Sequence, residues 1–217
     1  MVEYEDMKLL KQKETQGKDW DKYHTDRESA VLVVAPHGGT IEPHTDLIAK
    51  AIAKDDFSLF VFRGLRRNSS DRKWLHVTSG NYEEEDLTHL QKKVMVALSV
   101  HGAANKDGYK EKTTFMGGGD TLLRDLIWAR LEAHGFDAFL APAGLDGSYK
   151  GNFVNKSGPE QNIPGVQLEI SRGERDALAD TPARLERYAS AIREVLLPIN
   201  MQARDKSATK EDQKPSK

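Results

Sequence analysis

The chain contains no cysteine. This absence excludes disulfide bridges, thiolate metal sites and cysteine nucleophiles. Any metal ion must therefore be held by histidine, aspartate or glutamate, which disfavours a structural zinc site of the cysteine-rich type. A chain without cysteine forms no disulfides in an oxidising or in a reducing compartment. Its composition therefore does not tell in which of the two the protein works.

Long apolar runs and a strong excess of one charge are also missing. No stretch approaches the roughly 18 apolar residues of a membrane span. The net charge of −2 gives no reason to expect nucleic acid or an anionic membrane as a partner. The N-terminal segment MVEYEDMKLLKQKE contains acidic residues and lacks the apolar core of a signal peptide. We therefore expect a protein made in the cytoplasm, from which lysis could release it.

The composition suits one α/β domain. The 217 residues are 38% hydrophobic and 30% charged, which is enough to cover a central sheet with helices on both faces. We expect a charged N-terminal arm over residues 1–28, a catalytic domain over 29–203 and a disordered charged tail over 204–217. The apolar and turn patterns predict strands over residues 30–34, 58–62, 74–78, 94–100, 136–141 and 165–171.

A histidine and a carboxylate follow the first predicted strand. An unbroken apolar run, AVLVV, leads through Ala35-Pro36 to His37 and, after a short glycine-containing loop, to Glu42. Such a run predicts a strand buried on both faces, as in a parallel sheet covered by helices. Ligands of open α/β sheets bind beyond the carboxyl ends of the strands. His37 and Glu42 are therefore candidate ligands of zinc or another metal, although an ordinary polar loop would have the same spacing.

The same pattern occurs a second time. The buried strand VMVALSV is followed directly by His101 and Gly102. If the two strands are neighbours, their ends bring His37, Glu42 and His101 around one ion. Zinc hydrolases typically use three protein ligands and keep one position open for water.

The last predicted strand contains a carboxylate. In GVQLEIS the apolar residues alternate with Gln167, Glu169 and Ser171. A glutamate inside a strand is costly unless it has a partner. Glu169 is therefore either on a solvated sheet face or edge, or a general base beside a metal-bound water. Arg172 follows at once and could stabilise an oxyanion or bind a substrate carboxylate.

His76 and Arg66 are candidate substrate-binding residues. His76 stands between Leu75 and Val77 in a predicted strand, either as a hydrogen-bonded core or sheet-surface histidine or as a residue that faces the site. Arg66 belongs to a basic polar loop, which is either simply solvated or a patch that binds carboxylates.

Two asparagines are further candidates for substrate binding. Asn152 and Asn155 lie in the long loop 142–164, and loops of this length in compact domains are often functional. The preceding run Gly117-Gly118-Gly119 lacks the lysine and hydroxyl of a phosphate loop. We therefore interpret it as a turn before a helix that begins near Asp120.

Several of these segments together resemble a known family. The segments are APHGGTIE, LHVTS, SVHG, NFVN and GVQLEIS, in this order over roughly residues 30–175, and they resemble the phage-type zinc-dependent poly-γ-glutamate hydrolases. The resemblance implies a mixed α/β sheet of the zinc carboxypeptidase type. Carboxypeptidases space their first two ligands as HxxE, whereas four residues separate His37 from Glu42 here. The ligand assignment therefore follows the hydrolase family.

The resemblance also implies a chemistry. It implies one zinc ion held by His37, Glu42 and His101, with Glu169 as the catalytic base. The implied substrate is poly-γ-glutamate, an anionic capsule polymer of some bacilli, which phages degrade with such enzymes. Two alternatives stay open: a zinc-dependent deacylase or amidase acting on another small amide or on peptidoglycan, and a non-enzymatic phage accessory protein.

Overall fold

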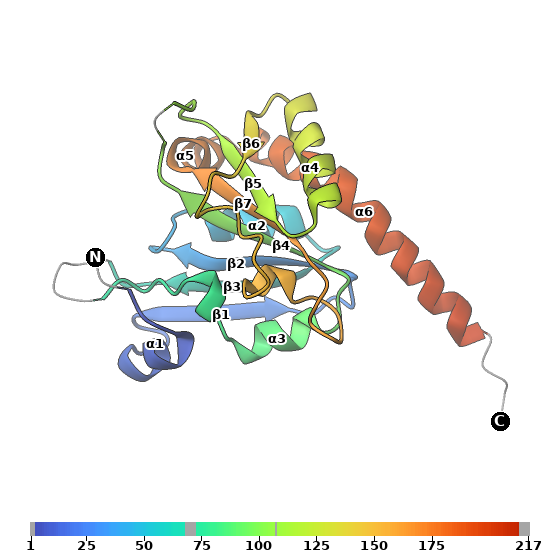
Figure 1. Ribbon diagram of the computed structural model, residues 1–217, viewed down its shortest axis with the longest axis horizontal. Helices are drawn as coiled ribbons and strands as arrows, with labels where there is room; N and C mark the ends of the chain where they lie inside the picture. The colour runs from blue at the N-terminus through green and yellow to red at the C-terminus, as the bar shows by residue number, and fades with distance from the viewer. Residues whose placement is uncertain (1–2, 68–72, 107, 213–217) are drawn as a thin grey trace.

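The protein is built around one seven-stranded mixed sheet (Figure 1). A computed structural model describes residues 3–67, 73–106 and 108–212. The sheet has the order β1-β3-β2-β4-β7-β5-β6, in which β3, β2, β4 and β7 are parallel, whereas β1 and β5 join antiparallel to their neighbours β3 and β7. This confirms the predicted single α/β domain with a mixed, mostly parallel sheet. The strands are β1 (Trp20–Thr25), β2 (Val31–Gly39), β3 (Ser58–Gly64), β4 (Val96–Ala103), β5 (Thr114–Gly118), β6 (Ala138–Leu140) and β7 (Val166–Ser171).

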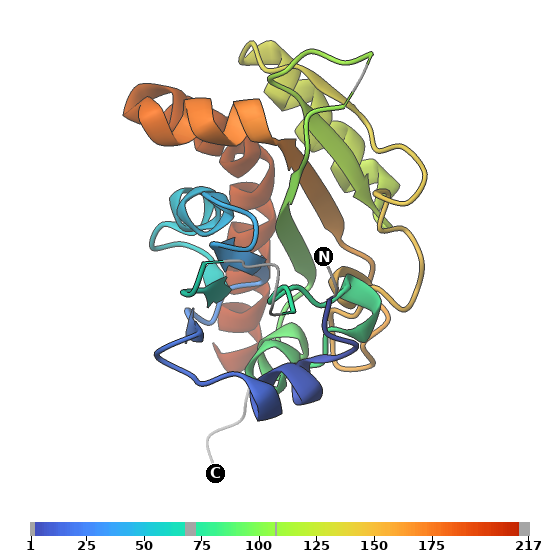
Figure 2. The ribbon, with the colours of Figure 1, turned by 90° about the vertical axis from the view of Figure 1, so that its left-hand side faces the viewer.

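Helices cover both faces of the sheet because the central strands are apolar on both sides. In β2, Val31 and Val33 belong to one buried cluster, and Leu32 and Val34 belong to the other. The first cluster packs under α2, α4, α5 and α6, and the second under α1 and α3, which lie side by side at the lower edge of Figure 2. The helices are α1 (Met7–Lys13), α2 (Thr45–Ala53), α3 (Glu85–Gln91), α4 (Thr121–Ala133), α5 (Arg172–Asp180) and α6 (Pro182–Asp212), with short 3₁₀ turns η1 (Ser79–Asn81) and η2 (Phe153–Asn155).

The predicted strand over residues 74–78 is wrong. This segment forms only an isolated bridge between Trp74 and Glu3 and otherwise runs as a loop across the ends of the central strands. The short apolar alternation arises because the loop buries its own side chains Leu75 and Val77 in the core, and not because the segment pairs in a sheet. This loop matters for function because it carries His76.

Two strands were not predicted. β1 lies in the segment expected to be an arm, and it pairs with β3 over its whole length. β5 includes Gly117 and Gly118, which were expected to form a turn. A Cβ atom at Gly118 would lie 2.2 Å from the carbonyl oxygen of Gly165, so these glycines permit a close approach of backbones.

The C-terminal helix is longer than expected. Disorder was predicted from residue 204, but α6 continues to Asp212 and extends beyond the body of the protein (Figure 1). Arginine, lysine, alanine and glutamate, which favour helices, make up five of the nine residues from 204 to 212, and the segment extends a helix that is already docked, so no new nucleation is needed. Within the described residues, no helix has the length and apolar character needed to cross a membrane.

Candidate metal centre

Four of the predicted site residues lie together at the carboxyl ends of the central strands. His37 ends the apolar part of β2, and Glu42 follows in the loop before α2. His101 lies in β4 and is directly paired with Glu169 of β7. All four side chains are buried. The sheet order β2-β4-β7 thus brings together residues that are up to about 130 positions apart in the chain, as the strand-end pattern predicted.

Glu42 is at the centre of this group. Its Oε1 atom lies 3.0 Å from His37 Nδ1, and its Oε2 atom accepts a hydrogen bond of 2.7 Å from the Gly102 amide. His101 Nδ1 lies 3.8 Å from the same Oε2 atom. The other ring nitrogen of His37 is 2.9 Å from the carbonyl oxygen of Val77. A carbonyl behind one ring nitrogen fixes the tautomer and turns the other nitrogen toward the site.

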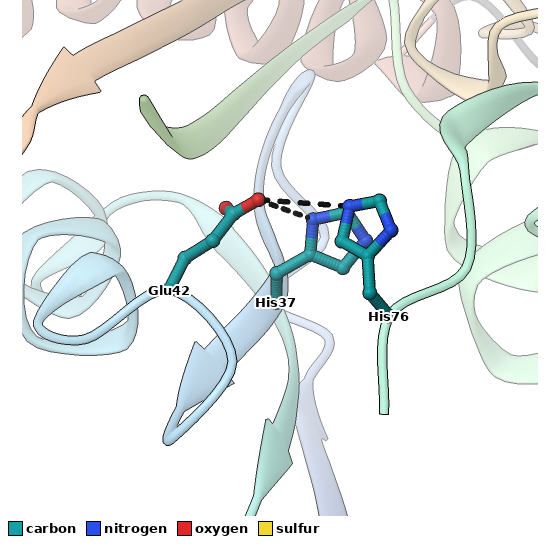
Figure 3. Close-up of side chains that lie close together, drawn as sticks. All are labelled: His37, Glu42 and His76. Carbon is teal, nitrogen blue, oxygen red and sulfur yellow. Dashed lines mark hydrogen bonds and ion pairs between the residues drawn. The ribbon is translucent and has the colours of Figure 1, made fainter. Parts of the chain in front are cut away.

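His76 belongs to the same cluster. The ligand atoms of His37, Glu42 and His76 all lie within 4.8 Å of one another (Figure 3). His76 Nε2 lies 3.8 Å from Glu42 Oε1, and its Nδ1 lies 3.1 Å from the carboxylate of Glu3. The ring is also sandwiched between His37 and Trp74, at centroid distances of 4.1 and 4.6 Å. Of the two alternatives for His76, the structure supports the one in which it faces the site.

The protonation states of this cluster suit metal binding. Burial lowers the pKa of His101 to about 3, and it lowers the pKa of His76 to about 4, with repulsion from His37 adding to both shifts. Burial alone would raise the pKa of Glu42, but its interactions with His37 and the other two imidazoles outweigh that effect and lower it. At neutral pH, His76 and His101 are therefore neutral and Glu42 is ionised. These are the forms in which both groups coordinate metals.

The donor set fits a zinc ion. It contains imidazoles and a carboxylate, which are the ligand types of catalytic zinc sites. The buried Nε2 atom of His101 has no hydrogen-bond partner in the described part of the chain, so the ring is held without a competing contact there. His37 and Glu42 are common to any choice of ligands. The third candidate ligand is either His76, which completes the group within 4.8 Å, or His101, as the sequence predicted, which lies 3.8 Å from Glu42.

Glu169 has a different environment. Its Oε1 atom accepts a hydrogen bond of 2.9 Å from Gln167 Nε2, and Gln167 Oε1 in turn accepts one of 2.8 Å from Asn152 Nδ2. Asn152 Oδ1 accepts a hydrogen bond from the backbone amide of Val154. The side-chain amides of Asn152 and Gln167 therefore each have a fixed orientation. Burial, with the nearby charge of Glu42, raises the pKa of Glu169 well above its ordinary value, and the hydrogen bond from Gln167 opposes the shift. Raising the pKa of a carboxylate in this way is typical of a general base.

The remaining predicted residues have structural partners. Asn155 accepts from the amides of Gly119 and Gly165 and donates to the carbonyls of Gly147 and Tyr149, so its amide group is fully used inside the protein. The guanidinium of Arg66 is buried and bonded to Glu14 and to the carbonyl of Lys73. Arg172 is half-exposed and bonded to Asp176.

Gln167 and Arg175 were not predicted as site residues. The alternation in β7 places Gln167 on the same face as Glu169, and this period was the signal that could have identified it. Arg175 lies one helical turn after Arg172 and is 4% exposed. Sequence alone offered no reason to prefer the second arginine of the segment SRGER to the first.

Comparisons with known proteins agree with this architecture. The sequence profile of the poly-gamma-glutamate hydrolase family matches residues 4–195. This chain belongs to that family. A solved structure of a bacteriophage poly-gamma-glutamate hydrolase is similar to this family member with a TM-score of 0.79 and 28% identity, over 90% of this chain and 96% of that one. A zinc-free structure of YndL is similar with a TM-score of 0.75 and 25% identity, over 90% and 98% of the two chains.

Relatives of this family member also occur in Bacillus subtilis (strain 168). The SPbeta prophage-derived protein YoqZ is 35% identical over 159 residues, which are 72% of this chain and 54% of YoqZ. YmaC is 33% identical over 165 residues, which are 75% of this chain and 66% of YmaC. The chain therefore spans between about half and two thirds of the length of these relatives.

Proposed function

We propose that this chain is a zinc-dependent hydrolase that cleaves the γ-glutamyl amide bonds of poly-γ-glutamate, with one zinc ion per chain. The proposal rests on two buried carboxylates, Glu42 and Glu169, that lie at one end of the sheet in different environments. A carboxylate surrounded by imidazoles lies beside a second carboxylate with a raised pKa. The family of the chain and the zinc-free form of its structural relative YndL support the metal and the substrate.

His37, Glu42 and His101 are the proposed ligands. His101 is preferred to His76 as the third ligand because it lies on a rigid central strand and is fully buried. His76 lies on a loop and contacts Glu3 with its second nitrogen. We therefore assign His76 to the wall of the site, where it contacts bound substrate.

Glu169 is the proposed general base. Zinc, when bound, supplies Lewis acidity that activates water and polarises the substrate carbonyl. Glu169 takes a proton from the attacking water and returns it to the leaving amine. Gln167 holds the carboxylate in place during both transfers, because its own amide is fixed by Asn152. A polar network that is fully hydrogen-bonded keeps such a group in one orientation.

Arg172 is a proposed contact for substrate carboxylates. Its side chain is half-exposed, and the ion pair with Asp176 is a surface pair that contributes little to stability. Of the two roles predicted for this arginine, the exposed position favours binding of a substrate carboxylate over stabilisation of an oxyanion in the buried site. Because the net charge of the chain is −2, recognition of a polyanion requires local cations of this kind.

The proposal is tested by the size distribution of poly-γ-glutamate after incubation with the protein. We expect the polymer to be shortened to oligomers, the reaction to stop when a chelator is added and to resume when zinc is restored. If the folded, zinc-loaded protein leaves the polymer intact, the proposed substrate is wrong. In that case release of amine from N-acylglutamate and from peptidoglycan fragments would distinguish a deacylase or amidase from a protein without enzymatic activity.

A further inference from the structure

One buried arginine contacts the backbone one or two residues after three of the site residues. Arg175 lies in the first turn of α5 and is 4% exposed. Its Nη1 atom donates to the carbonyl of Pro43 at 2.5 Å, its Nε atom to Ile170 at 3.0 Å, and its Nη2 atom to Ala103 at 3.2 Å. Pro43 directly follows Glu42, Ile170 directly follows Glu169, and Ala103 lies two residues after His101.

Only arginine can make this set of contacts. A guanidinium carries five N–H donors in a rigid planar fork, whereas a lysine ammonium presents one nitrogen at the end of a flexible chain. Within the described residues, no carboxylate is hydrogen-bonded to Arg175, but its charge interacts with those of Glu42 and Glu169. A cation held by carbonyls in this way connects three segments and partly balances two buried carboxylates.

Gly102 provides the space for this guanidinium. A Cβ atom at position 102 would lie 2.6 Å from Arg175 Cζ and 2.7 Å from its Nε atom, which is closer than real Cβ contacts permit. The amide of the same glycine donates to Glu42 Oε2. The glycine that follows His101 therefore serves the site twice, because it bonds to Glu42 and leaves room for Arg175.

We propose that Arg175 is a positioning residue for the metal centre: it fixes the segments that carry Glu42, His101 and Glu169 relative to one another. In this role Arg175 acts through its hydrogen bonds to backbone carbonyls and through its charge, and not as a ligand of the metal or a contact of the substrate. The proposal extends the proposed function, since it concerns the same site. It predicts that loss of Arg175 weakens zinc binding and slows turnover more than the loss of protein stability explains.

The test compares Arg175→Met with a matched control, Arg193→Met. Arg193 is also a buried arginine on a helix, and it donates to the carbonyls of Ile52 and Ala53 at the C-terminal end of α2 and pairs with Asp56. We expect both variants to melt at a lower temperature. We expect Arg175→Met alone to weaken zinc affinity by about 10-fold or more and to lower kcat by a similar factor with KM changed less than about threefold, because partners behind a metal ligand have effects of this size. Arg175→Lys should be intermediate.

A second variant keeps the proposal testable if Arg175→Met does not fold. Gly102→Ala pushes on the guanidinium without removing it, and should also weaken zinc binding. In the double variant Arg175→Met/Gly102→Ala the added methyl group meets no guanidinium. We therefore expect the two effects to be non-additive, with the double variant no worse than Arg175→Met alone.

The outcomes separate this proposal from the proposed function. If Arg175→Met and Gly102→Ala both bind zinc within about twofold of the natural protein while their melting temperatures fall as in Arg193→Met, Arg175 is merely structural and the proposal is overturned. If the natural protein binds zinc but does not cleave poly-γ-glutamate, the proposed substrate fails, yet the zinc affinities still decide the role of Arg175. If zinc does not bind at all, hydrogen exchange of the Gly102 amide in the metal-free protein tests the role of Arg175. Faster exchange in Arg175→Met than in Arg193→Met would support the role, and equal exchange would contradict it.

Discussion

The two buried carboxylates at the strand ends lie in opposite environments. Glu42 is surrounded by His37, His76 and His101 and has a lowered pKa, so it stays ionised and is suited to hold a cation. Glu169 accepts a hydrogen bond from the neutral amide of Gln167, and burial together with the nearby negative charge of Glu42 raises its pKa. Neighbouring carboxylates whose environments separate their pKa values can take different roles in one reaction. The Glu42 side therefore resembles a metal site and the Glu169 side a proton-transfer site.

The largest effect is expected from Glu169→Gln. The glutamine keeps the shape of the side chain but cannot accept the proton, so turnover of poly-γ-glutamate should fall by about 100-fold or more. Zinc content, measured by atomic absorption on the same sample, should be unchanged. A Glu169→Gln variant with full activity would remove Glu169 as the base, and a variant without zinc would make it a ligand.

The two histidines that compete for the third ligand position should differ clearly. His101→Ala should weaken zinc affinity by more than about 100-fold, since even residues behind a ligand contribute about 10- to 100-fold. His76→Ala should retain zinc and mainly raise KM. Metal titrations of both variants test this difference. If His76→Ala loses zinc and His101→Ala keeps it, the ligand set is His37, Glu42 and His76.

Gln167 offers a finer test of the Glu169 side. Gln167→Leu removes the hydrogen bond to Glu169, the proposed catalytic base, and should lower kcat by roughly 10-fold, because a bond to a charged group is worth about 1.5–3 kcal/mol. Gln91→Leu is the matched control. Gln91 is a buried glutamine whose amide donates to the carbonyl of Phe153 and does not contact Glu169. Equal loss of kcat in the two variants would indicate a general effect of burying leucine, not a role in holding Glu169.

The smallest effect concerns stability and pH. The raised pKa of Glu169 means that the folded protein binds this proton more tightly than the unfolded chain, whose glutamates titrate near 4.3. Its contribution to the stability of the metal-free protein is therefore complete below that pH and is lost as pH rises through the folded pKa. Glu169→Gln should be more stable than the natural chain at pH 7, by on the order of 1 kcal/mol, and should lose this advantage near pH 4. Denaturant unfolding at the two pH values measures the difference, and an equal difference at both would contradict the assignment.

The sequence predicted the strand ends better than it predicted the loops. His37 and His101 were found because long apolar runs identify buried strands, and residues that follow such strands meet at one edge of the sheet. Glu169 was found because a carboxylate inside an alternating strand is costly unless it has a partner. The position of His76 was not predictable, since its segment is a loop whose path depends on contacts with Glu3 and Trp74. Local patterns contain no information about such long-range contacts.

The neighbouring arginines show a second limit. Arg172 and Arg175 lie in one charged segment, and only the start of α5 at Arg172 decides which of them is exposed and which is buried. Similarly, β5 was missed because a short strand that ends in glycines has the composition of a turn. Its existence depends on the close approach of the Gly165 backbone, a contact that lies 47 residues away from Gly118 in the chain.

The central claim is that the Glu42 side holds a metal ion and the Glu169 side does not. An anomalous difference map of zinc-loaded crystals, measured at the zinc absorption edge, tests it most directly. The account predicts one peak per chain, bound by His37, Glu42 and His101, with Glu169 facing the ion without binding it. A peak bound by Glu169, or no peak between His37 and Glu42, would contradict it.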